Sequence, residues 1–171
     1  MGRQSAADGH SLEAVLVVWG KEEEGQGLPL LEAAIGRGFN GDGHLFMRFM
    51  AQLQAALPTD ARLVLRGSTL TGFRYEGGHP HDADGPGTSD IDITAISEEA
   101  LARWHPDGFY LPGILSIPLS DEHPEYAPWL DPSRRRAQEM VGRPVTVQAM
   151  AGWFLELRTA LLETPYLYLD A

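Results

Sequence analysis

Apolar residues recur along two stretches of the chain with the spacing of an amphipathic helix. Between residues 44 and 57 they fall three or four positions apart, which predicts a helix with Asp42 as its N-cap and Pro58 beyond its end. A similar spacing predicts a final helix over residues 149–163. The side chains expected on its core-facing side are those of Met150, Trp153, Phe154, Leu157 and Leu161.

A shorter apolar segment, residues 28–35, predicts a helix that ends at Gly36. A G-x-G-x-x-G pattern follows, whereas a dinucleotide-binding fingerprint should come after a strand. Because a helix is expected before it, we interpret the pattern as a flexible turn. Residues 11–19 form either a buried strand or a short helix, since so short an apolar run has no decisive period. The glycines of the pattern are Gly36, Gly38 and Gly41.

Strand-like segments separated by polar stretches predict a sheet. They cover residues 61–67, 90–97, 113–120 and 144–150. Ser97 is expected to begin a further helix. The mixture of helices and strands predicts an α/β (α+β) fold in which helices pack against a mixed sheet. We expect residues 41–171 to form one globular domain, with residues 1–40 as an N-terminal extension packed on it.

Composition narrows the class of protein. The 171 residues suffice for one domain with a proper core, and the absence of cysteine excludes disulfides and zinc–thiolate sites. The longest apolar run, Ala14–Trp19, is too short to span a membrane, and no basic-then-apolar leader is seen, so we expect a cytoplasmic protein. Lys21 is the only lysine, which hints at a GC-rich bacterial genome. The net charge of −11 argues against blanket neutralisation of duplex nucleic acid.

The first of two short motifs with chemical meaning is Arg66-Gly67-Ser68, at the end of a predicted strand. A glycine at that point lets the backbone bend without a Cβ, so that backbone N–H groups can converge on a phosphate. The serine hydroxyl adds a neutral donor for the same anion. The motif therefore indicates a phosphate-binding turn.

The second motif is the pair Asp90 and Asp92 in the predicted strand 90–97. Side chains two residues apart on a strand project from the same face, so both carboxylates point one way. Two carboxylates that close repel each other unless a cation lies between them. Carboxylate oxygens are the ligands that Mg²⁺ prefers, so the pair predicts a magnesium site.

Taken together, RGSTLTG (66–72) and GTSDIDIT (87–94) resemble the signature of the DNA polymerase beta-like nucleotidyltransferase superfamily, and the resemblance covers mainly residues 44–97. It implies a nucleotidyltransferase-like mixed sheet in a bacterial member with a long inserted loop. It also implies two Mg²⁺ ions on Asp90 and Asp92, and a nucleoside triphosphate whose phosphates lie on Gly67-Ser68. An acceptor hydroxyl then attacks the α-phosphorus, and pyrophosphate leaves.

The sequence departs from the pattern of this family in two places. The connection from Ser68 to Asp90 is long, as an inserted hairpin or flap over the site would be. The third carboxylate of the family lies on a later strand, but the matching strand here offers Thr146 and Gln148. If no acid reaches the metal, the protein is a slow catalyst or only binds nucleotide. The acids that could substitute are Asp121, Glu122, Asp82 and Asp84.

The same motifs have plainer interpretations: a tight turn for the Gly-Ser pair, and a solvent-facing row on an edge strand for the Asp pair. Arg66 and Arg74 flank the phosphate motif and either bind the triphosphate or form surface ion pairs. Residues 134–136, three arginines, are interpreted as a solvated run. We interpret the His/Asp-rich segment 76–88 as a mobile, exposed loop, with a transition-metal site as the alternative.

The sequence therefore predicts a nucleotidyltransferase that binds Mg²⁺ and a nucleoside triphosphate. The alternative is a non-catalytic protein of the same fold that serves as a nucleotide-binding, regulatory or antitoxin-like module. The acidic charge favours a small-molecule or protein acceptor over a nucleic acid.

Overall fold

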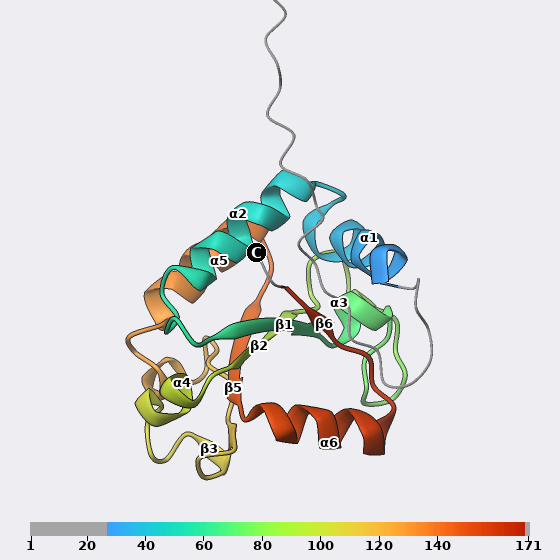
Figure 1. The fold of residues 1–171 in the computed structure, drawn as a ribbon. Helices are drawn as coiled ribbons and strands as arrows, with labels where there is room; N and C mark the ends of the chain where they lie inside the picture. Colours follow the sequence, from blue (N-terminus) through green and yellow to red (C-terminus); the bar gives the residue numbers. More distant parts are fainter. Residues whose placement is uncertain (1–26, 170–171) are drawn as a thin grey trace, which may run out of the picture.

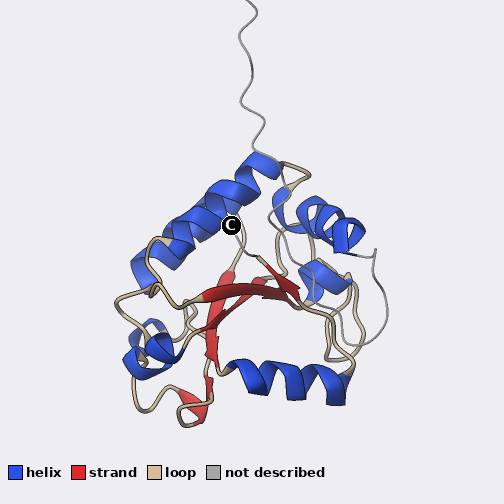
Figure 2. Ribbon diagram, viewed as in Figure 1, coloured by secondary structure: helices blue, strands red, loops and turns tan. Residues whose placement is uncertain are grey.

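Residues 27–169 are described in the computed structural model and form a mixed α/β fold (Figure 2). This part of the chain contains six α-helices and one six-stranded mixed sheet, which confirms the predicted fold class. The helices are α1 (Gly27–Phe39), α2 (Gly43–Gln54), α3 (Ser68–Thr71), α4 (Glu98–Arg103), α5 (Asp131–Val141) and α6 (Gly152–Leu162). A 3-10 turn, Pro124–Tyr126, precedes α5.

The sheet has the strand order β3-β4-β5-β2-β1-β6. Its strands are β1 (Arg62–Arg66), β2 (Ile91–Ile96), β3 (Phe109–Leu111), β4 (Leu115–Ser116), β5 (Val145–Met150) and β6 (Leu167–Tyr168). Strand β2 pairs with β1 in antiparallel and with β5 in parallel orientation, so the strand after Asp90 is central. The interpretation of the Asp pair as part of an edge strand is therefore wrong.

Helices cover both faces of the sheet: α1, α2 and α5 lie on one side, and α6 lies on the other (Figure 1). The main core cluster includes side chains of the first group, such as Phe39 and Leu53, together with Leu63 of β1. The smaller cluster on the opposite face includes Val64 of β1 and Leu155 of α6. Neighbouring residues of β1 thus enter different cores, because side chains alternate along a strand.

Two helix starts lie where the sequence predicts them. The Asp42 carboxylate accepts a hydrogen bond from the backbone N–H of Leu45 at 3.0 Å, and α2 follows. The Ser97 hydroxyl accepts one from the N–H of Ala100 at 2.9 Å, and α4 follows. Each side chain satisfies one of the N–H groups that a first helical turn leaves without a partner. Both N-cap predictions are confirmed.

Helix α1 passes through Gly36 and Gly38, so the predicted end at Gly36 is wrong. A Cβ at Gly38 would lie 2.9 Å from Cγ2 of Thr69, which means that this glycine lets α1 approach α3 closely. The chain turns only after α1, where Asn40 and Gly41 have positive φ angles. The flexible-turn interpretation therefore fails for the first two glycines of the pattern.

Helix α5 corrects the interpretation of residues 134–136 as a solvated run. The side chain of Arg134 is fully buried. It donates hydrogen bonds to Asp131 at 2.9 Å, to Asp121 at 2.7 Å and to the carbonyl of Val145 at 3.1 Å. The other two arginines are exposed. A buried charge is tolerated here because paired carboxylates and a carbonyl surround it.

Helix α6 also differs from the prediction, because its apolar face is largely uncovered. Leu155 is buried, but Trp153 is 58% exposed and Leu161 is 71% exposed. The assignment of Trp153 to the core is therefore wrong. Segment 113–120 forms only the short strand β4 and an isolated bridge from Leu119 to Val147. Strands β3 and β6 were not predicted.

The N-terminal predictions are only partly covered by the structure. Residues 11–19 lie outside the described residues. Side chains of α1, such as Leu31 and Ala34, belong to the same core cluster as the sheet. The domain boundary after residue 40 stays a prediction. No helix within residues 27–169 has the length and apolar composition needed to cross a membrane.

Candidate functional site

The two halves of the sequence motif meet at one end of the central strands. Asp92 of β2 lies opposite Arg66, the last residue of β1, and in register with Thr146 of β5. Gly67 and Ser68 follow Arg66 directly, at the start of α3. The strand pairing alone therefore brings the Gly-Ser turn beside the aspartate-bearing strand.

Gly67 is fixed by its own conformation and by the approach of Asp92. Its φ of 77° lies in the region that favours glycine. A Cβ at this position would overlap Oδ2 of Asp92. Two residues further on, Oγ1 of Thr69 donates a hydrogen bond to the backbone carbonyl of Asp90 at 3.2 Å. The turn after β1 thus contacts both aspartate residues.

The negative charge of Asp92 is only partly compensated by the protein. Burial, and then the neighbouring charge of Asp90, raise the pKa of Asp92 to about 6. The hydroxyl of Thr146, which donates to Oδ1 of Asp92 at 2.8 Å, and the charge of Arg66 oppose this rise. A nearby cation would stabilise the ionised form of such a carboxylate. Both residues offer oxygen ligands of the kind that suit magnesium.

This raised pKa predicts a pH-dependent stability of the metal-free protein. Above its ordinary value of 3.8, the unfolded Asp92 loses a proton that the folded side chain keeps up to about pH 6. Raising the pH therefore lowers the free energy of unfolding, by roughly 2–3 kcal/mol for this group. Urea denaturation in EDTA at pH 4.5 and 7.5 measures the loss, and Asp92→Asn should lack it. The exposed Asp107→Asn should behave like wild type, and a pH-independent difference between Asp92→Asn and wild type would contradict the expectation.

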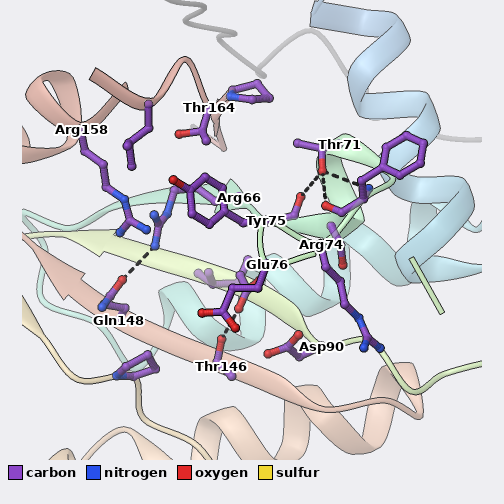
Figure 3. A pocket seen from close by; sticks show the side chains of 18 of the residues that line it. Arg66, Thr71, Arg74, Tyr75, Glu76, Asp90, Thr146, Gln148, Arg158 and Thr164 are labelled. Atoms are coloured by element: carbon purple, nitrogen blue, oxygen red, sulfur yellow. Dashed lines mark hydrogen bonds between the residues drawn. The ribbon is translucent and has the colours of Figure 1, made fainter. Parts of the chain in front are cut away.

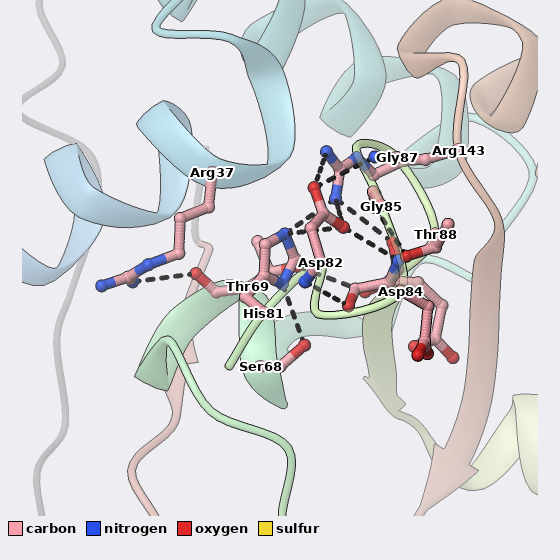
Figure 4. A network of polar contacts seen from close by, with 12 residues as sticks. Arg37, Ser68, Thr69, His81, Asp82, Asp84, Gly85, Gly87, Thr88 and Arg143 are labelled. Carbon is pink, nitrogen blue, oxygen red and sulfur yellow. Dashed lines mark hydrogen bonds and ion pairs between the residues drawn. The ribbon is translucent and has the colours of Figure 1, made fainter. Parts of the chain in front are cut away.

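The Ser68 hydroxyl belongs to a hydrogen-bonded chain that begins at Arg143 (Figure 4). Nη1 of Arg143 lies 2.7 Å from Nε2 of His81, and Nδ1 of His81 lies 2.9 Å from Oγ of Ser68. A guanidinium only donates, so Nε2 accepts. Burial lowers the pKa of His81, and the neutral ring then carries its proton on Nδ1 and donates it to Ser68. The Ser68 O–H remains to donate to a group in front of it.

Asp82 ties the long connection between Ser68 and Asp90 to the rest of the fold. Its carboxylate accepts hydrogen bonds from the backbone N–H groups of Gly87 and Ser89, at 3.0 Å and 2.9 Å. It also accepts two from Arg143 (Figure 4). Although burial acts in the opposite direction, these hydrogen bonds lower the pKa of Asp82 to about 2. This part of the connection is therefore ordered by an ionised carboxylate.

The transition-metal alternative for this connection finds no support. Both ring nitrogens of His81 already have partners, Ser68 and Arg143. Among residues 27–169, no three histidine, aspartate or glutamate side chains form a group that could hold a metal ion. The mobile-loop interpretation is wrong for His81, whose side chain is 7% exposed, whereas His79 is exposed as expected.

The two arginines predicted to flank the phosphate motif have different surroundings. Arg74 forms an ion pair with the exposed Asp84 at 2.8 Å. Arg66 donates to neutral side chains, among them the Gln148 amide oxygen at 2.8 Å. Burial, and then the charge of Arg158, lower the pKa of Arg66 to about 10. Arg158 of α6 is a site residue that the sequence did not single out.

The residues considered as replacements for the family's third carboxylate lie in separate places. Thr146 contacts Asp92, as described above. The Gln148 side chain accepts from Arg66 and donates to the carbonyl of Ser116. Asp121 accepts hydrogen bonds from Arg134 and Gln138 and does not line the cavity described next. Asp82 and Asp84 are likewise occupied by partners. Strand β5 therefore brings a hydroxyl, not an acid, to Asp92.

The site opens into a cavity of about 1150 Å³ (Figure 3). Gly67, Ser68, Asp90 and Asp92 all line it. Its remaining acidic lining residue among those described is the exposed Glu76, from the long connection. Part of the opposite wall is apolar and comes from α6. The arrangement combines a hydroxyl donor, a glycine turn and two carboxylates around one space.

Comparisons of the chain with known protein families, with curated proteins and with solved structures found no match. Its function must therefore be argued from the geometry and chemistry of this cavity.

Proposed function

We propose that the protein binds a nucleoside triphosphate as its magnesium complex and transfers the nucleotidyl group to an acceptor hydroxyl. The single observation that carries this proposal is the convergence of the two motif halves on one cavity, with Gly67 in contact with Asp92. The resemblance to DNA polymerase beta-like nucleotidyltransferases attaches this chemistry to the same residues. An isolated Gly-Ser turn or Asp-x-Asp strand would be far weaker support.

Asp90 and Asp92 are the residues that would hold magnesium. Their oxygen donors suit the ion, and burial and the charge of Asp90 raise the pKa of Asp92, which Thr146 and Arg66 offset only in part. When bound, magnesium neutralises charge on the phosphates and assists the attacking hydroxyl.

Ser68 and Gly67 would bind the phosphate chain. Ser68 receives a hydrogen bond from His81, so its own O–H is free to donate to a phosphate oxygen. Gly67 carries no side chain that would keep the phosphate away from the backbone. The hydrogen bond from Arg143 to His81 fixes the His81 ring, and the ring in turn positions the Ser68 hydroxyl before the nucleotide binds.

The reaction proposed is a displacement at the α-phosphorus. The acceptor oxygen bonds to that phosphorus, and the bond from it to the bridging oxygen of the β-phosphate breaks. Pyrophosphate leaves with the bridging oxygen, and the hydroxyl proton passes to water or to a cavity carboxylate. The net charge of −11 favours a small molecule or a protein as acceptor, because a nucleic acid would be repelled.

A second candidate is a non-catalytic protein that binds the magnesium nucleotide without transferring it. The observation that favours it is Thr146, which stands beside Asp92 where the resemblance implies a third carboxylate. A hydroxyl at that position cannot act as a base at neutral pH. Both candidates require nucleotide binding by the Asp pair.

The experiment that separates them is incubation of the protein with each α-labelled nucleoside triphosphate, magnesium and a bacterial extract. Transferase activity predicts label in a protein or small-molecule fraction with wild type and with Asp107→Asn, but not with Asp90→Asn. Binding of the nucleotide without transfer to any fraction would favour the non-catalytic candidate. Absence of both binding and transfer would contradict the proposal altogether.

A further inference from the structure

The cavity contains a second charged region that the roles of Asp90 and Asp92 leave unexplained. Arg66 at the end of β1 and Arg158 of α6 both line the cavity, and their guanidinium groups lie side by side (Figure 3). The hydrogen-bond partners of Arg66 are the neutral side chains of Thr94 and Gln148. Within the part of the chain that the structure describes, Arg158 has no ion pair or hydrogen bond.

Two adjacent guanidinium groups repel each other, and proteins ordinarily offset such a pair with carboxylates. The charge of Asp92 reaches Arg66, but no ion pair joins the two among the described residues. The forked donors of a guanidinium match the oxygens of a phosphate or a carboxylate. An anion between Arg66 and Arg158 would remove the repulsion and fill unused donors.

The wall beside this arginine pair is apolar. Phe154, Leu157 and Leu161 of α6 line the cavity, and Leu161 is 71% exposed. The cavity volume of about 1150 Å³ exceeds what one ligand of ordinary size fills. There is thus room for an apolar group next to the arginine pair, in addition to a nucleotide.

We propose that Arg66 and Arg158 form a subsite for the phosphate or carboxylate group of an organic ligand whose apolar part packs against α6. The anion has two possible sources, the acceptor molecule or the phosphate chain of the nucleotide. Only the choice between these sources rests on the proposed function. Binding of the anion itself needs no metal.

The test measures binding of phenyl phosphate and inorganic phosphate by calorimetry in EDTA. Phenyl phosphate is expected to bind wild type more tightly than inorganic phosphate, and Arg158→Gln should weaken both by about tenfold or more. The matched control is Arg48→Gln, an exposed arginine of α2 that does not line the cavity, and it should leave both affinities unchanged. Equal affinities of wild type and Arg158→Gln, or an equal loss in Arg48→Gln, would overturn the subsite. Equal binding of the two phosphates would overturn its apolar part.

A second titration, at saturating magnesium and a non-hydrolysable ATP analogue, identifies the source of the anion. Phenyl phosphate that still binds points to the acceptor, whereas phenyl phosphate that is displaced points to the phosphate chain of the nucleotide. Both results support the subsite. Binding of phenyl phosphate that depends on Arg158, in a protein that binds no magnesium nucleotide, would keep the subsite and refute the proposed function.

Discussion

Replacement of Asp90 by asparagine is expected to weaken binding of the magnesium–ATP complex by at least about 100-fold while the protein stays folded. The variant removes one of the two carboxylates that are proposed to bind magnesium. The described contact of Asp90 with the turn after β1 uses its backbone carbonyl, which asparagine retains. Equilibrium dialysis with labelled ATP measures the affinity, and the thermal midpoint measures the fold.

The same substitution has a second expected effect, which separates a metal ligand from a structural residue. The charge of Asp90 raises the pKa of Asp92, so Asp90→Asn should lower that pKa and leave the metal-free protein at least as stable above pH 6. Asp107→Asn, which removes an exposed charge, should change neither property. A large loss of stability together with unchanged nucleotide affinity would mean that Asp90 is structural.

Gly67→Ala is expected to lower the free energy of unfolding by roughly 3 kcal/mol or more. One part of this cost is the positive φ of 77°, which an alanine adopts only with strain of about 1–3 kcal/mol. The other part is the overlap of the new Cβ with Oδ2 of Asp92, which must move. Urea denaturation measures the loss, and nucleotide affinity should fall with it.

Gly41 offers a comparison, because its φ is also 77° and nothing lies within 4 Å of an added Cβ there. Gly41→Ala should therefore cost clearly less than Gly67→Ala. In an Asp92→Ala background the cost of Gly67→Ala should shrink, since the overlapping carboxylate is gone. Equal costs at both glycines, or an unchanged cost in that background, would refute the contact between the turn and Asp92.

The central part of the fold and the position of the motif could be predicted from the sequence. Segments 61–67, 90–97 and 144–150 carry short strand patterns that correspond to β1, β2 and β5. Which strands pair was not predicted: the structure shows β2 beside β1, and this pairing places Gly67-Ser68 beside Asp92, where the family resemblance expects them. The local sequence was enough to locate these three strands, because most of their side chains are buried and therefore apolar or small.

Features that depend on distant partners could not be predicted in the same way. Arg134 lies in a run of three arginines, yet it is buried because Asp121 and the carbonyl of Val145 surround it. The contact of His81 with Arg143 joins residues 62 positions apart. Helix α5, which the sequence analysis did not predict, includes Pro132, and proline is tolerated there because it lies in the first helical turn.

The exposed face of α6 has a physical reason of its own. Its apolar spacing indicates an amphipathic helix, but spacing does not say which surface covers the face. In the structure, Leu157 and Leu161 line the cavity instead of the core. The prediction of a core face failed there because Leu157 and Leu161 remain 46% and 71% exposed.

A calorimetric titration of the wild-type protein with a non-hydrolysable ATP analogue, once in magnesium and once in EDTA, tests directly whether Asp90 and Asp92 hold a magnesium nucleotide. If the Asp pair holds the ion that carries the nucleotide, the affinity in magnesium exceeds the affinity in EDTA by at least about 100-fold. Equal affinities in the two buffers, or no binding in either, would mean that Asp90 and Asp92 do not form a magnesium nucleotide site.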